Sequence, residues 1–206
     1  MNLVIKYSIE SEADRIGGTL DKYNWFKENK YRVNLPESIK DKAEKGETVE
    51  HSEILEVLNR EYKEDVYSNA EKILITEFSK IKQSFEENLK KLNGPIFESY
   101  NLSITKYGVG GSYRTPNNIQ VNIDYGKEIS WKTIAHEIVH LTIEDWIKEF
   151  KIDHWSKERI VDLIMTNFFP NQVYIQGNHE DKKEISEIFN QYFPDIKRVI
   201  VEVSKL

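Results

Sequence analysis

The sequence predicts an α+β fold that forms one domain over residues 1–206: a small mixed sheet, a backing helix, a second, apolar helix and a C-terminal helical part. Three observations carry this prediction. Two segments alternate polar and apolar residues as strands do, a long segment repeats apolar residues at helical spacing, and 39% of the residues are hydrophobic, enough for a core. Gly94-Pro95 divides the domain into a mainly helical half (1–95) and a second half (96–206).

The first half is expected to act as scaffold. Residues 1–9 predict a strand, the charge run 36–50 predicts a solvated helix or loop, and residues 54–62 predict a short helix. A capping box at Ser68 and Glu71 then begins a long helix, whose apolar stripe runs to Leu92. We expect this helix to back the sheet of its own domain, although such a stripe can also form a dimer seam. Because packing within its own domain is the expected role of this helix, we favour a monomer.

Two further strands are predicted before the apolar helix. Residues 102–107 and 119–123 alternate, and Gly108, Gly110 and Gly111 lie between them with the turn at 116–118. A glycine-rich turn can bind phosphate, but this one lacks the Lys-Ser/Thr of a P-loop, and no helix follows it. We interpret the segment as a hairpin.

The helix that follows contains His136, Glu137 and His140, a His-Glu-x-x-His spacing. Residues four apart lie one turn above each other on one helix face, so both imidazoles can bind one zinc ion. Glu137 is then placed to act as general base toward a water molecule activated by the metal. The alternative is a chance or purely structural motif. The helix is the most apolar of the chain, and buried imidazoles without partners are costly, which favours the metal site.

Two histidines do not complete a catalytic zinc site, which usually has three protein ligands. Trp146 and Ile143 stand where the metzincin pattern requires histidine and glycine, so that class is excluded. Glu144 lies one turn further along the helix and is expected to be too distant. The better candidate is Glu158, in a new helix that Ser156 can cap.

Asp162 falls on the same face of that helix as Glu158 and can accept the second ring N–H of a zinc histidine. Either acid has an ordinary alternative. An acidic residue in the first turn is favoured by the helix dipole without any metal, and Asp162 can pair with a neighbouring base.

With these residues, the segment from about 102 to 165 resembles the gluzincin metallopeptidases, in which His-Glu-x-x-His is followed by Glu-x-x-x-Asp on the next helix. The resemblance implies a zincin-like fold that holds one zinc ion per chain. Its ligands are His136, His140 and Glu158, with Glu137 as general base and Asp162 supporting a ligand. Glu158 follows His140 by eighteen positions, one fewer than in larger members, so the connecting loop must differ.

The resemblance also implies how a substrate binds. Similar peptidases pair an extended peptide with an edge strand above the zinc helix. Residues 119–123 are the expected edge strand, with Ile119, Val121 and Ile123 as substrate-binding residues. An oxyanion donor is expected downstream, and Tyr174 and His179 are the candidates, although core packing and solvent exposure are their ordinary roles. Asn178 is expected to cap a helix that Pro194 stops, and residues 199–203 to form a last strand or a packed extension.

Composition narrows the function. The absence of Cys excludes disulfides and thiolate zinc sites, and residues 1–9 lack the basic, apolar pattern of a signal peptide, so a cytoplasmic location is expected. No apolar run is long enough for a membrane helix, and the net charge of −6 disfavours nucleic acid. The sequence therefore predicts zinc-dependent hydrolysis of a peptide or protein substrate, a metalloprotease activity. The alternatives are a non-catalytic or regulatory zinc-binding protein on the same scaffold and an interaction protein built on the long helix.

Overall fold

A computed structural model describes residues 1–124, 131–170, 172 and 182–206. Its strands are β1 (Asn2–Lys6), β2 (Ser99–Thr105), β3 (Gly111–Arg114) and β4 (Asn118–Asn122). Its described helices are α1 (Ile9–Leu20), α2 (Tyr23–Glu28), α3 (Glu37–Lys45), α4 (His51–Glu61), α5 (Glu64–Lys90), α6 (Trp131–Glu149), α7 (His154–Phe168), α8 (Lys183–Tyr192) and α9 (Ile196–Val203). The predicted α+β class with a small mixed sheet is confirmed.

The sheet has the strand order β1-β2-β4-β3, with β1, β2 and β4 parallel and β3 antiparallel to β4. The predicted hairpin between 102–107 and 119–123 is wrong, because β2 and β4 pair in parallel with Leu102 opposite Ile119. The hairpin is formed by β3 and β4 instead. Two parallel neighbouring strands need a connection that returns the chain to the same end of the sheet. Here β3 is part of the connection between β2 and β4, and it pairs with the outer side of β4.

The predicted edge strand is therefore corrected as well. Ile119, Val121 and Ile123 belong to or follow β4, an interior strand, and their side chains are 0%, 3% and 8% exposed. They pack in the core, and an interior strand cannot pair with a substrate along its edge. The edge strand on this side of the sheet is β3.

The apolar face of the sheet packs against α5 and α6. The long helix α5 buries Leu74, Phe78, Phe85 and Leu89 and contacts β2 and α6, so it backs the sheet as predicted. It begins at Glu64, one turn before the predicted capping box. Glu64 and Asp65 suit the positive end of the helix dipole, and burial of Tyr67 holds this extra turn against the core.

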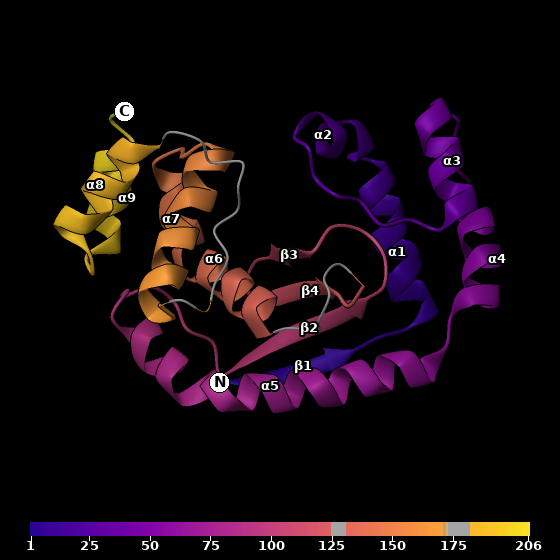
Figure 1. The fold of residues 1–206 in the computed structure, drawn as a ribbon, viewed down its shortest axis with the longest axis horizontal. Helices are drawn as coiled ribbons and strands as arrows, with labels where there is room; N and C mark the ends of the chain where they lie inside the picture. Colours follow the sequence, from indigo (N-terminus) through magenta and orange to yellow (C-terminus); the bar gives the residue numbers. More distant parts are fainter. Residues whose placement is uncertain (125–130, 171, 173–181) are drawn as a thin grey trace.

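Helices α1, α3 and α4 form a second, smaller core with Leu35 and Tyr107 beside one end of the sheet. The charge run 36–50 contains α3, which buries only Ile39, so of the predicted solvated helix or loop the structure forms the helix. On the opposite side lie α6 to α9 (Figure 1). The sheet thus forms a floor between two helical walls.

The C-terminal segment 199–203 belongs to helix α9, so of the two predicted alternatives the packed extension is confirmed and the last strand is wrong. Ile196, Val199, Ile200 and Val203 repeat at helical spacing, and all four are buried against the core. Packing of this stripe outweighs the strand preference of β-branched residues. The described part of the chain contains no helix that is long and apolar enough to span a membrane.

Candidate metal centre

Helix α6 places His136 and His140 one turn apart, as their spacing requires. The helix is buried on several sides, by Ile134, Ile138 and Leu141 among others, so the two imidazoles project from a rigid, packed element. The side chain of His140 is almost fully buried, and that of His136 is partly open to the cleft described below.

Helix α7 brings the acidic residues to the same place. Asp153 caps it by accepting hydrogen bonds from the amides of Trp155 and Ser156, so the predicted cap at Ser156 is wrong. The Ser156 hydroxyl donates to the Asp153 carboxylate instead. An earlier start places Glu158 in the second turn, where the helix dipole does not account for an acid.

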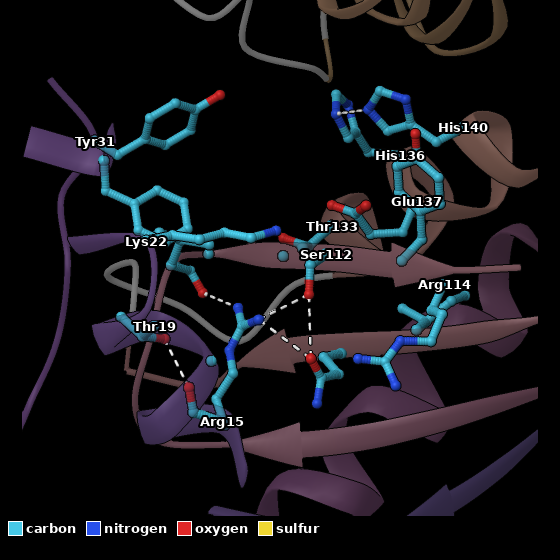
Figure 2. A pocket seen from close by; sticks show the side chains of 18 of the residues that line it. Arg15, Thr19, Lys22, Tyr31, Ser112, Arg114, Thr133, His136, Glu137 and His140 are labelled. Atoms are coloured by element: carbon cyan, nitrogen blue, oxygen red, sulfur yellow. Dashed lines mark hydrogen bonds between the residues drawn. The ribbon is translucent and has the colours of Figure 1, made fainter. Parts of the chain in front are cut away.

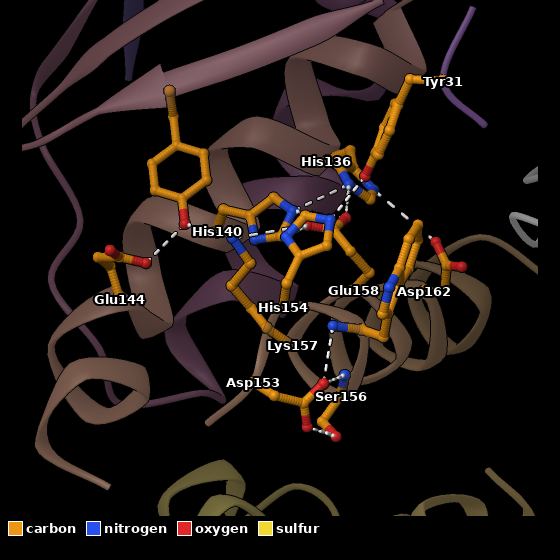
Figure 3. A network of polar contacts seen from close by, with 12 residues as sticks. Tyr31, His136, His140, Glu144, Asp153, His154, Ser156, Lys157, Glu158 and Asp162 are labelled. Atoms are coloured by element: carbon orange, nitrogen blue, oxygen red, sulfur yellow. Dashed lines mark hydrogen bonds and ion pairs between the residues drawn. The ribbon is translucent and has the colours of Figure 1, made fainter. Parts of the chain in front are cut away.

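Three ligand atoms converge between the two helices (Figure 3). Nε2 of His136 and Nε2 of His140 are 3.0 Å apart, and they lie 3.3 and 3.2 Å from Oε2 of Glu158. Ligands of a tetrahedral zinc ion, about 2.0–2.1 Å from the metal, lie ~3.3 Å from each other. The described residues thus contain a buried His-His-Glu group whose spacing fits a small divalent metal ion.

The two oxygens of Glu158 have different surroundings. Oε2 faces both histidines, whereas Oε1 lies 3.5 Å from Nζ of Lys157 and 3.8 Å from Nδ1 of His154. Lys157 and His154 therefore hold one oxygen, which leaves the other for a metal. Although burial opposes it, the imidazoles of His140 and His136 lower the pKa of Glu158 well below its usual range, so the group stays a carboxylate.

The imidazoles differ in protonation. Burial lowers the pKa of His140 to about 4, which keeps it in the neutral, metal-binding form. Burial also lowers the pKa of His136, but hydrogen bonding to Glu158 and the charges of Glu137 and Asp162 raise it above its ordinary value. Oδ1 of Asp162 lies 3.9 Å from Nδ1 of His136, on the side predicted for a supporting acid but beyond hydrogen-bond length.

Glu137 points to the other side of the centre and touches the edge strand. A Cβ placed on Gly111 of β3 would lie 2.3 Å from Oε1 of Glu137 and 2.6 Å from Cγ2 of Thr133. Only glycine fits at this contact without displacing the carboxylate. Burial raises the pKa of Glu137 to about 7, against the lowering effect of His136. A carboxylate of this kind can accept a proton near neutral pH.

Glu144 is not among the three described residues of the His-His-Glu group. It accepts a hydrogen bond of 2.6 Å from the Tyr113 hydroxyl and pairs with Lys148 at 3.2 Å. Tyr113 belongs to β3, and its ring stacks on His140 at 4.8 Å. Lys157 donates to the same hydroxyl at 3.1 Å, which links the edge strand to α7.

The centre opens into a cleft of about 1880 Å³ that extends over β3 to α1, α2 and the segment after α2 (Figure 2). Across this cleft Tyr31 reaches the centre from the opposite wall, and its hydroxyl lies 2.7 Å from Nε2 of His154 (Figure 3). Trp25 packs edge-on against His154 at 5.1 Å. Aromatic contacts thus join the two walls above the floor of the cleft.

The structure brings together His136, Glu137, His140, Glu158 and Asp162. The predicted oxyanion donors Tyr174 and His179 lie outside the described residues, as does Asn178. Further side chains at the centre were missed: His154, Lys157 and Tyr31. The sequence carried a signal for His154 alone, because it precedes Glu158 by four residues and shares its helix face.

Comparisons with protein-family models, with curated proteins and with solved structures found no match for this chain.

Proposed function

We propose that this protein is a zinc metallopeptidase, a hydrolase of the zincin type. One observation carries the proposal: the buried His-His-Glu group and the carboxylate of Glu137 lie in one cleft beside an edge strand. Two imidazoles and one carboxylate are a donor set typical of catalytic zinc. A purely structural zinc site is usually closed by four protein ligands.

The roles of the residues follow from their positions. His136, His140 and Glu158 would hold the zinc ion, and Lys157 and His154 would keep Glu158 in place through its second oxygen. When bound, zinc supplies Lewis-acid polarisation of a carbonyl group and makes a water molecule acidic enough to react near neutral pH. Glu137 takes the proton of the attacking water and passes it to the leaving amine.

The edge strand β3 offers main-chain groups for an extended peptide. Asn122 N donates to Gly110 O at 2.9 Å, and hydrogen-bonded pairs alternate along an antiparallel ladder. Ser112 and Arg114 therefore direct their main-chain groups to β4, whereas those of Gly111 and Tyr113 point away from it. A substrate that pairs with Gly111 and Tyr113 would lie next to Glu137, which touches Gly111.

The hydroxyl of Tyr31 is suited to donate to a substrate carbonyl oxygen. It enters from the wall opposite Glu137's helix, and its contact with His154 fixes its direction. In this proposal Tyr31 takes the part for which Tyr174 and His179 were the candidates.

The test combines metal content with a cleavage screen on one preparation. We expect about one zinc per chain by elemental analysis, cleavage of at least one peptide from a library of extended sequences, and loss of cleavage after chelation that added zinc restores. A protein that takes up no zinc would contradict the proposed metal centre. A protein that holds zinc but cleaves nothing in the library supports the non-catalytic, regulatory alternative instead.

A further inference from the structure

The cleft has a charge balance opposite to that of the whole chain. The chain has 35 acidic and 29 basic residues, but the described residues that line the cleft include eight Lys or Arg and six Asp or Glu. Three of those six acids, Glu137, Glu158 and Asp162, belong to the metal centre. The bases exceed the acids by only two, so the charge that a bound molecule meets depends on which of these groups are exposed.

Most of these bases are open to solvent. Among the described residues that line the cleft, the exposed bases are Lys6, Lys22, Lys30, Arg32, Arg114 and Lys132, whereas the exposed acids are Asp14 and Asp21 alone. No carboxylate of the described residues lies within ion-pairing distance of Lys22 or Arg114. Their charges are therefore available to a bound molecule.

The edge strand arranges two positive charges at a fixed spacing. Ser112 and Arg114 are two residues apart on β3, so their side chains leave the same face of the strand. Arg15, 8% exposed, donates from Nη1 to the Ser112 hydroxyl at 2.8 Å and to Oε1 of Gln120 at 3.2 Å, and from Nη2 to the Val109 carbonyl at 2.9 Å. These bonds fix a second cation beside Ser112. Figure 2 shows Arg15 and Arg114 on one side of the strand and Glu137 and His140 on the other.

A peptide paired with β3 shares this alternation. Every second side chain of the peptide would face Arg15 and Arg114, and the others would face Tyr113 and the metal centre. Arg114 is three residues along the strand from Gly111, which touches Glu137, so it lies roughly 10 Å from the base at about 3.4 Å per residue. The basic side thus starts close to the reacting bond and extends away from it.

We propose that the cleft selects extended peptides with acidic side chains at alternate positions, up to about three residues from the cleaved bond. This inference rests on the proposed function for the orientation of the peptide, but recognition is separable from cleavage. An acidic peptide is favoured over nucleic acid because the cations follow a strand edge with main-chain groups turned outward, which an extended chain can pair with.

The test measures binding in zinc-loaded Glu137→Gln protein, so that no peptide is cleaved. Four fluorescent peptides of equal length are compared. The first carries two Glu at alternate positions, the second two Glu at adjacent positions, the third two Gln and the fourth two Lys. The Kd of each peptide is measured by fluorescence anisotropy. We expect the alternate Glu peptide to bind most tightly, by about 2–5-fold per acidic residue over Gln at low salt. Salt near 1 M should remove most of the difference.

Matched variants locate the charges. Lys22→Gln and Arg114→Gln should each reduce the preference for Glu over Gln by about 2–5-fold. Lys27→Gln is the control, because Lys27 is an exposed lysine of α2 that does not line the cleft. It should leave the preference unchanged.

Several outcomes would overturn the inference: equal binding of Glu and Gln peptides, no binding of any peptide, an equal effect of Lys27→Gln, or equal binding of adjacent and alternate Glu peptides. Displacement of the acidic peptide by a lower concentration of a single-stranded oligonucleotide would point to nucleic acid instead. If the parent protein cleaves nothing while the acidic preference persists, the proposed function fails and the inference stands. If the parent protein cleaves peptides but binds Glu and Gln peptides equally, the proposed function stands and the inference fails.

Discussion

The two walls of the cleft differ in how firmly they hold their functional side chains. On the metal wall, α6 and α7 bury His140, Glu137 and Glu158 until they are 2%, 6% and 6% exposed. On the opposite wall, Lys22 is exposed and Trp25 is 40% exposed. The metal-binding groups are fixed by packing, whereas Lys22 and Trp25 remain open to solvent; Arg15, on the same wall as these two, is the exception at 8% exposed. The comparison predicts that the same kind of change has larger effects on the metal wall.

The largest expected effect is that of Glu137→Gln. This change keeps the shape of the side chain but removes proton acceptance, and positioned general bases contribute about 10²–10⁴-fold. We expect the kcat for any peptide found by screening to fall by about that factor while zinc content stays at the parent level. Turnover like that of the parent would contradict the assigned base.

The next effect concerns the metal itself. Glu158→Gln removes the carboxylate that faces both histidines. Loss of a residue that only supports a metal ligand typically lowers metal affinity by about 10–100-fold, so loss of the ligand Glu158 should lower zinc affinity by more than that. Glu144→Gln is the matched control, because Glu144 bonds to Tyr113 rather than to the histidines. Competition with a chromogenic chelator measures both affinities. The reverse ranking of the two variants would move the third ligand onto α6.

Gly111→Ala tests the contact between the edge strand and the base. Its new methyl group would overlap Oε1 of Glu137 and Cγ2 of Thr133, and both belong to a buried helix with little room to move. Small displacements of catalytic groups can cost up to about 10²-fold, so we expect a roughly 10–100-fold lower kcat with zinc retained.

Gly17→Ala provides the control for that change. Gly17 lies in α1, and a Cβ there meets no atom within 4 Å. Alanine should leave kcat unchanged and raise the free energy of unfolding by about 0.4–1 kcal/mol in urea titrations. Equal losses of activity in the two glycine variants would mean that the contact with Glu137 has no special role.

The smallest effect is expected for the aromatic contacts between the walls. Trp25 stacks on Tyr31 at 5.6 Å and packs edge-on against His154, and aromatic pairs contribute about 0.5–1.5 kcal/mol. Trp25→Ala should loosen Tyr31 and lower kcat/KM by about 2–10-fold, with zinc content unchanged. Val66→Ala, at an exposed position on α5, should have no effect on steady-state kinetics. A loss near that of Glu137→Gln would show that the walls are equally constrained.

The sequence by itself determined the parts of this protein that depend on local periodicity. Residues four apart on a helix must share a face, so the spacing of His136 and His140 alone implied that they bind one ligand together. The same rule applied to Glu158 and Asp162 on the next helix, although their cap proved to be Asp153. The apolar stripe of α5 was predicted for the same reason.

Only the tertiary structure decided what depends on contacts between distant segments. Alternation identifies a strand but not its neighbours, so the interior place of β4 and the edge position of β3 could not be read from residues 102–123. Tyr31 and Arg15 reach the cleft from more than ninety residues before their partners His154 and Ser112. Such contacts depend on how the two helical walls pack on the sheet. The spacing of residues in the sequence does not determine that packing.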